Sequence, residues 1–288
     1  MGHDRRVLSY ADEGAGSVVV LLHGWPVTPL HWRRITPGLI DAGFRVLTVT
    51  LPGLGDAKDE TLAGNDSDSV GALDKPGLAM AVARRLADLH VNDVAVVGHD
   101  WGATVAYLVA ASVDLQPDVR VRALVVEEEV PPGVSAEIPS PGRASYPDWH
   151  GPFLRVPGLA EALLPGREDV FHRAFLKASA GPTGLEAATI EVYLDAYRGR
   201  RAVAAAAGYY RTTSQDAAAV LKVATNPLTA PVLSIGGSHG MGTAVRDAFK
   251  QLANHVEHLQ VPAAGHYPAE QNSDAILPRL LTHLQRGG

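Results

Sequence analysis

The chain has 288 residues, 46% of them hydrophobic, which suits one large α/β domain or such a domain with an inserted lid. Its net charge is −6 and it has no block of Lys or Arg, which argues against nucleic acid or anionic membranes as partners. It contains no cysteine, so disulfides, thiolate catalysis and cysteine-based metal sites are excluded.

No stretch of the sequence predicts membrane insertion. Residues 1–14 lack an apolar signal core, and the longest uncharged apolar run, 18–22 with its flanks, is far shorter than the roughly 20 residues of a transmembrane helix. We therefore expect a cytoplasmic protein, a monomer or a homodimer, with no membrane and no nucleic acid among its partners.

The first part of the chain alternates between strand and helix patterns. Residues 17–22 and 44–50 are β-branched runs typical of strands buried on both faces of a parallel sheet, and residues 30–42 between them favour a helix. Residues 57–77 are polar and predict a surface loop. Apolar residues at helical spacing then predict a helix over 78–90.

A five-residue turn, Gly98-His99-Asp100-Trp101-Gly102, stands at the centre of this pattern. It follows an apolar strand at 94–97 and precedes a small-residue helix at 103–109. A strand that enters a helix through a tight turn flanked by glycines is the setting of a nucleophile elbow, which lifts the central side chain into the open. The central side chain here is Asp100, where many such turns have serine.

The alternation stops after a further predicted strand at 119–126. Prolines and aromatic residues become dense, and helical patterns follow, including an Ala-rich helix at 201–210. We interpret residues 131–221 as a helical cap inserted into a core made of residues 1–130 and 222–288.

Strands and helices alternate again after the insertion. Strands are predicted at 231–235 and 255–261, and helices at 242–253 and 275–285. This alternation at both ends of the chain indicates an α/β fold, with a mostly parallel sheet covered by helices on both faces. In such sheets the chemistry lies at the carboxyl ends of the strands.

Two further segments follow predicted strands and carry groups suited to catalysis. His23-Gly24-Trp25-Pro26 follows the first strand, and the backbone N–H groups of Trp25 and Trp101 could stabilise an oxyanion. His266 follows the last strand, late in the chain, where a general base is expected after the nucleophile and the acid.

The acid that would orient His266 has two possible positions. The segment after the penultimate strand, residues 236–240, has no carboxylate, whereas the strand before the insertion ends in Glu127-Glu128-Glu129. We choose Glu128 as the acid and keep Glu129 as the alternative.

Two patterns that could indicate a metal or a cofactor fail. His255 and His258 lie at a strand start with no third ligand nearby, and the glycines of residues 236–242 lack the spacing of a dinucleotide fingerprint. We therefore expect no metal and no cofactor.

Together, the His23–Pro26 segment, the Gly98–Gly102 turn, the late Gly265-His266 pair and the inserted helices resemble the α/β-hydrolase superfamily. The resemblance is to its epoxide hydrolase branch, whose Asp nucleophile is shared with dehalogenases, and it covers the chain from about Ser17 onward. It implies an α/β-hydrolase fold with an inserted helical cap.

The resemblance also implies roles for single residues. Asp100 matches the nucleophile, His266 the base and Glu128 the acid, and Trp25 and Trp101 match the two oxyanion donors.

In epoxide hydrolases a Tyr followed by Arg, late in the cap, donates a hydrogen bond to the epoxide oxygen, and Tyr210 before Arg211 matches it. A second such Tyr, early in the cap, aligns with Phe153, which has no proton to donate. Either Tyr210 acts alone or a nearby donor replaces the missing Tyr, the closest in sequence being Trp149, His150 and Tyr146. We assign substrate contacts to Trp149, His150, Phe153 and Tyr209.

We therefore expect an enzyme that hydrolyses a small apolar epoxide to a vicinal diol through an ester on Asp100. The alternative is a haloalkane or haloacid dehalogenase with the same ester. Against it, Trp25 stands where haloalkane dehalogenases usually have Asn, and Gly151 where a haloacetate enzyme would have a halide-facing Trp. A remoter alternative is a ligand-binding protein with little turnover, against which the intact Asp100 and His266 argue.

Overall fold

The computed structural model describes residues 8–55, 73–112 and 119–286. Its strands form one sheet of seven strands in the order β1-β3-β2-β4-β5-β6-β7. The strands are β1 (Ser9–Gly14), β2 (Ser17–Leu22), β3 (Phe44–Thr50), β4 (Asp93–His99), β5 (Arg120–Glu127), β6 (Val232–Gly237) and β7 (Val256–Val261).

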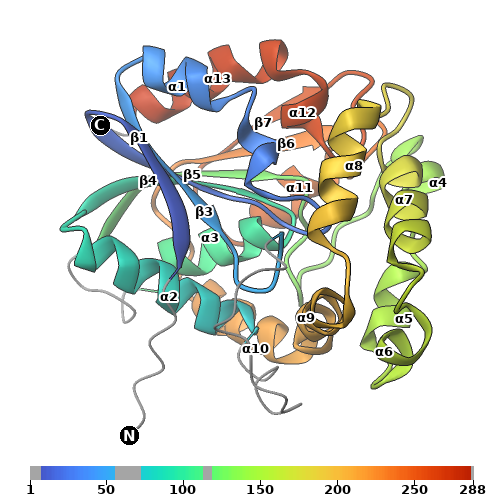
Figure 1. The fold of residues 1–288 in the computed structure, drawn as a ribbon. Helices are drawn as coiled ribbons and strands as arrows, with labels where there is room; N and C mark the ends of the chain where they lie inside the picture. The colour runs from blue at the N-terminus through green and yellow to red at the C-terminus, as the bar shows by residue number, and fades with distance from the viewer. Residues whose placement is uncertain (1–7, 56–72, 113–118, 287–288) are drawn as a thin grey trace, which may run out of the picture.

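Helices cover the sheet and fill most of the remaining described chain (Figure 1). Those before β6 are η1 (Pro29–Trp32), α1 (Thr36–Asp41), α2 (Lys75–Asp88), α3 (Trp101–Ala111), α4 (Gly142–Ser145), α5 (His150–Arg155), α6 (Leu159–Leu163), α7 (Glu168–Ser179), α8 (Ala187–Ala196), α9 (Arg200–Arg211) and α10 (Thr213–Ala224). Those after β6 are α11 (Ala244–Phe249), α12 (Pro268–Gln271) and α13 (Ser273–Arg286).

The strands from β2 onward pair in parallel, so the mostly parallel sheet is confirmed. The exception is β1, which pairs antiparallel with β3 at the edge of the sheet. Its sequence, SYADEG, is largely exposed and has no apolar run. Sequence patterning therefore gave no sign of this strand.

The side chains of β2 show how the two faces of the sheet are covered. Val20 belongs to a core cluster with Leu78 of α2 and Val105 of α3. Val19, which points to the opposite face, belongs to a second cluster with Leu280 of α13. In Figure 1, α1 and α13 accordingly lie on one side of the sheet and α2 and α3 on the other. Helices on both faces are what the continuous apolar strands predicted.

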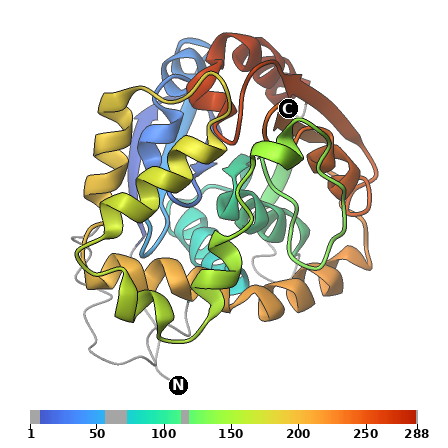
Figure 2. The same ribbon diagram turned by 90° about the vertical axis from the view of Figure 1, so that its right-hand side faces the viewer.

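The helices α4 to α10 lie in the chain between β5 and β6. Figure 1 shows α5 to α9 beside one end of the sheet, and Figure 2, which looks onto that side, shows these helices in front of the strands. The predicted Ala-rich helix at 201–210 corresponds to α9.

One helix prediction was wrong. Residues 30–42 do not form a continuous helix, because η1 ends at Trp32 and α1 begins only at Thr36. Pro37 lies in the first turn of α1. A proline has no N–H to donate to the preceding turn and its ring clashes with that turn, so Pro37 favours the start of a helix over its interior.

The predicted boundary between the polar loop at 57–77 and the helix that follows it lies too late in the chain. Residues 75–77, expected in a polar loop, form the first turn of α2, and the Asp74 carboxylate caps it by accepting a hydrogen bond from Gly77 N at 2.7 Å. The rest of that expected loop, up to residue 72, lies outside the described residues. The helix expected over 242–253 is shorter, since α11 spans Ala244–Phe249.

Within the described part of the chain, every helix falls short of the length and apolarity that crossing a membrane would require.

Candidate active site

The turn between β4 and α3 forces Asp100 into an unusual backbone conformation. Its φ is 51°, which side-chain-bearing residues rarely adopt. A Cβ on Gly98 would lie 2.4 Å from the carbonyl oxygen of Gly102, and a Cβ on Gly102 would lie 2.4 Å from that of Leu22. Only glycines fit at both positions, so the sequence here dictates a sharp, crowded turn.

The carboxylate of Asp100 is held from two sides. The backbone N–H of Trp25 donates to Oδ1 at 2.8 Å, and Nε2 of His266 lies 3.3 Å from Oδ2. The approach of Trp25 requires Gly24, because a Cβ there would lie 2.4 Å from Oδ1. Burial acts to raise the pKa of Asp100, but His266 and the backbone N–H of Trp101 hold it below its ordinary value. Asp100 is therefore an ionised, nearly buried nucleophile candidate.

His266 follows β7 and lies between two carboxylates. Its Nδ1 atom is 3.2 Å from Oε2 of Glu128, and its backbone N–H donates to the carbonyl of Ser179 at 2.8 Å. Burial acts to lower the pKa of His266, but the negative charges of Asp100 and Glu128 outweigh it and raise the pKa to about 9. The ring is thus protonated at neutral pH while both carboxylates are charged.

Of the two acid candidates, Glu128 is the one that contacts His266. Its φ is 53°, and its carboxylate accepts hydrogen bonds from Gly237 N at 2.7 Å and from Met241 N at 2.9 Å. The side chain of Glu129 instead accepts from the Thr104 hydroxyl of α3. Burial and the nearby Asp100 charge raise the pKa of Glu129 to about 8, so this group is neutral at neutral pH.

Tyr210 and His150 meet above the Trp25 side chain. The Tyr210 ring packs edge-on against the rings of Trp25 and Trp101, with centroids 5.5 and 5.2 Å apart. The His150 ring stacks on Trp25 at 5.6 Å and lies 5.4 Å from the Tyr210 ring. Burial lowers the pKa of His150 to about 4, so its imidazole is neutral. Two side chains with polar hydrogen atoms therefore converge beside the nucleophile turn.

The three other residues assigned to the substrate make different contacts. Tyr209 is fully buried and donates its hydroxyl to the carbonyl of Pro52 at 2.8 Å, which ties α9 to the loop after β3. Phe153 and Trp149 both pack against Phe171, and Trp149 is 42% exposed.

Tyr146, which was considered as a replacement donor, lies between His150 and His266, and its ring packs edge-on against the His150 ring at 6.1 Å. Its ring also packs edge-on against the ring of His266, with centroids 5.0 Å apart. Of the three candidate replacements, His150 is the one whose ring packs against the Tyr210 ring.

Sequence reasoning missed a buried lysine. Lys75 is fully buried, and its Nζ lies 3.8 Å from the centroid of the Trp101 ring. It pairs with Asp216 of α10, Nζ to Oδ2 at 2.9 Å, and also donates to the Thr212 hydroxyl. Both charged residues occur in segments that look like exposed helix ends, so no signal in the sequence would have paired them.

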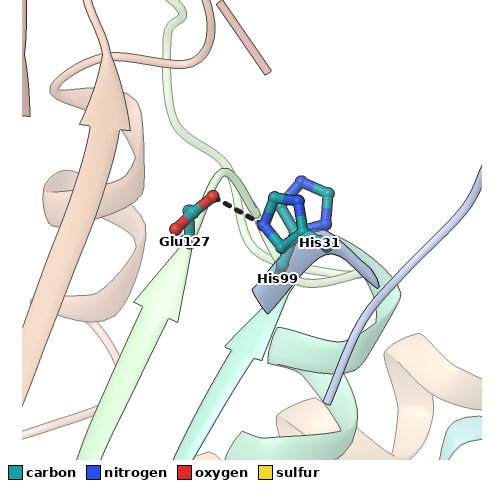
Figure 3. A group of neighbouring side chains, drawn as sticks. All are labelled: His31, His99 and Glu127. Carbon is teal, nitrogen blue, oxygen red and sulfur yellow. Dashed lines mark hydrogen bonds and ion pairs between the residues drawn. The ribbon is translucent and has the colours of Figure 1, made fainter. Parts of the chain in front are cut away.

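A second buried polar group lies behind His266 and consists of His31, His99 and Glu127 (Figure 3). One potential ligand atom from each lies within 4.8 Å of the others, which raises the question of a metal. However, the two imidazole rings stack with centroids 4.2 Å apart and an interplanar angle of 28°. The lone pairs of stacked rings run nearly parallel and do not converge on one ion, so the group fits a metal poorly.

Comparison with known proteins identifies the family of the chain. A model of the alpha/beta hydrolase family matches residues 19–279. The soluble epoxide hydrolase of Corynebacterium sp. is 29% identical, with 95% of this chain and 92% of that protein covered. Epoxide hydrolase A of Mycobacterium tuberculosis is 26% identical, with 97% and 93% covered. The solved structure of epoxide hydrolase CorEH without ligand superposes with a TM-score of 0.81 at 27% identity, with 97% and 95% covered.

Proposed function

Because the chain belongs to the alpha/beta hydrolase family, we propose that it is an epoxide hydrolase that opens a small epoxide to a vicinal diol through an ester on Asp100. The names of its relatives support the reaction, and the position of Asp100 supports the mechanism. A carboxylate is a good in-line nucleophile toward a strained sp³ carbon and needs no base to activate it.

The first half-reaction forms the ester. A carboxylate oxygen of Asp100 attacks one epoxide carbon, the C–O bond of that carbon breaks, and the released oxygen takes a proton from Tyr210. His150, beside Tyr210, supplies the second hydrogen bond to this oxygen. It replaces the tyrosine that epoxide hydrolases have at the position of Phe153. The aromatic surroundings of these side chains favour an apolar substrate.

The change in charge on Asp100 prepares the second half-reaction. The pKa of His266 is held at about 9 by two carboxylates, and ester formation removes the charge of one of them. The pKa of His266 therefore falls, and its proton passes to the Tyr210 phenolate. The neutral imidazole can then serve as a base.

The second half-reaction hydrolyses the ester. His266, oriented by Glu128, takes a proton from a water molecule that attacks the ester carbonyl. The backbone N–H groups of Trp25 and Trp101 stabilise the oxyanion, and losing one such donor typically costs about 3 kcal/mol of barrier. Collapse releases the diol and restores the Asp100 carboxylate and the protonated His266.

We further infer that residues 131–221 act as a cap over this site. Two contacts support the assignment. Tyr197, just after α8, donates its hydroxyl to the carbonyl of Val27 at 2.7 Å, and the ring of Tyr210 of α9 packs against the ring of Trp25. The cap thus supplies the groups that bind the epoxide oxygen, while the core supplies Asp100, His266 and Glu128.

The observation that carries the proposal is the Asp100 carboxylate, held by the Trp25 N–H on one oxygen and facing His266 with the other. The test is a single turnover in ¹⁸O-water with enzyme in excess over an epoxide. The label is expected in Asp100 and not in the first diol, because the oxygen added to the substrate comes from the carboxylate. Label in the diol from the first turnover would mean direct attack by water and would contradict the ester mechanism.

Dehalogenation through the same ester is the second candidate, and one observation favours it. Among the described residues, the buried indole N–H of Trp25 meets no hydrogen-bond acceptor. Such a donor could bind a departing halide. Measuring halide release and diol formation on one panel of substrates separates the two activities.

A further inference from the structure

The polar group of His31, His99 and Glu127 makes hydrogen bonds to the segment that carries His266. Nε2 of His99 donates to the backbone carbonyl of His266 at 2.8 Å. Oε1 of Glu127 accepts from the backbone N–H of Ala269 at 3.2 Å and from Nε2 of His31 at 3.0 Å. Because His31 stacks on His99, these contacts form a continuous network across the back of the His266 segment.

The network is unusual because all three side chains are fully buried. Within the described part of the chain, no hydrogen-bond partner is present for Nδ1 of His31, Nδ1 of His99 or Oε2 of Glu127. Burying polar atoms without full hydrogen bonding costs free energy, and apolar side chains would fill the same space at lower cost. What these polar residues add over apolar ones is therefore their hydrogen bonds to the His266 segment.

These bonds join both reacting residues. His99 directly precedes Asp100, and the backbone N–H of Asp100 donates to the carbonyl oxygen of Glu127 at 3.0 Å. The network thus links the backbone of the nucleophile to the backbone of the base. A carbonyl oxygen can only accept, so Nε2 of His99 carries the proton, and burial keeps the ring neutral by lowering its pKa well below the ordinary value.

We propose that His99, His31 and Glu127 are positioning residues that hold His266 in place for hydrolysis of the Asp100 ester. The inference rests on the proposed function, because it assigns the network to one of its two half-reactions. His266 is required as a base only in the second half-reaction. A small displacement of its ring that keeps its charge beside Asp100 therefore slows hydrolysis of the ester far more than its formation. An error of about 1 Å in such a position can cost about 100-fold in rate.

The test measures the two half-reactions separately in rapid-quench experiments, with the Asp100 ester followed by intact-protein mass. His99→Phe keeps a ring in the stack but removes the bond to the His266 carbonyl, and Glu127→Leu removes both bonds of Oε1. We expect each to slow ester hydrolysis about 10- to 100-fold, with ester formation within about 2-fold of the unmodified protein. Glu127→Gln keeps an accepting oxygen and is expected to restore hydrolysis to near the original rate.

Glu168→Leu is the matched control, because Glu168 is a buried carboxylate that also accepts a backbone N–H, from Gly199 at 3.1 Å. It begins α7, about 16 Å along the helix from Ser179, and should leave ester hydrolysis unchanged. The proposal is overturned if the His99 and Glu127→Leu variants slow both half-reactions equally or neither. It is also overturned if Glu127→Gln behaves like Glu127→Leu.

A variant that fails to fold and a failure of the proposed function give different results in these experiments. If Glu127→Leu does not fold, as judged by thermal unfolding, His99→Phe decides the question by the same criterion. If the unmodified protein forms no ester on Asp100, the proposed function fails at that point, before any variant is compared.

Discussion

Tyr209 and Tyr210 are neighbours on α9, yet their side chains serve different parts of the molecule. The Tyr209 hydroxyl donates to the carbonyl of Pro52, whereas the Tyr210 ring packs against Trp25 and Trp101 beside the nucleophile turn. Because successive residues on a helix point about 100° apart, one tyrosine can bond to the core while the next faces the nucleophile turn. Tyr209→Phe can therefore serve as the control for Tyr210→Phe.

Tyr210→Phe should slow the first half-reaction. The variant keeps the ring contacts but cannot donate a proton to the epoxide oxygen, so formation of the Asp100 ester should fall about 10- to 100-fold. Tyr209→Phe should leave ester formation near its original rate and lower the free energy of unfolding by about 1 kcal/mol. Stopped-flow single turnovers and urea unfolding measure the two effects. Equal rates of ester formation in both variants would remove Tyr210 from the reaction.

His266→Gln should trap the ester. The attack by Asp100 needs no base, so the first half-reaction proceeds, while hydrolysis loses its base and slows about 10²- to 10⁴-fold. Intact-protein mass should then increase by the mass of the epoxide. Loss of activity without such an adduct would show that His266 does not act in hydrolysis.

The sequence predicts those site residues that lie at the ends of strands. Asp100 and Glu128 come directly after the apolar strands β4 and β5, and His266 lies in the loop after β7. The carboxyl ends of parallel strands meet at one edge of the sheet. Order along the chain and alternation of strand and helix were therefore enough to bring these three together. The sequence could not decide between Glu128 and Glu129, because the choice depends on the positive φ at Glu128.

Other features depend on contacts that no local pattern reveals. The edge strand β1 is polar and exposed, and it is a strand only because β3 offers it an antiparallel partner. Lys75 and Asp216 are 141 positions apart and each has the character of a surface residue, but the fold buries them together. The break in the helix predicted over 30–42 is different, since Pro37 was a visible signal that apolar spacing outweighed.

Glu128→Gln should shift the pH dependence of ester hydrolysis. In the ester form Asp100 is uncharged, and Glu128 remains as the carboxylate that contacts the His266 ring and raises its pKa. Removing that charge lowers the pKa of His266, so the acid limb of the hydrolysis rate moves to lower pH. The plateau rate should also fall, by about 10- to 100-fold, because a less basic imidazole accepts the water proton less readily.

The control for this shift is Glu129→Gln. The Glu129 side chain accepts from the Thr104 hydroxyl and does not contact the His266 ring, so its substitution leaves the Glu128 carboxylate against that ring in place. The acid limb of ester decay, measured in single turnovers across pH, should stay in place. An unmoved limb in Glu128→Gln would mean that another group sets the basicity of His266.

Lys75→Met should destabilise the fold by leaving a buried charge unpaired. Asp216 would keep its hydrogen bonds from the Lys75 backbone N–H and the Thr212 hydroxyl but lose its counter-charge, which typically costs about 3–5 kcal/mol. In the double variant Lys75→Met/Asp216→Leu no charge is left buried, so most of that loss should be recovered. Urea unfolding of the two single variants and the double variant gives the coupling energy directly. If the double variant is as unstable as the sum of the single ones, the two side chains act independently and the pair does not fasten α2 to α10.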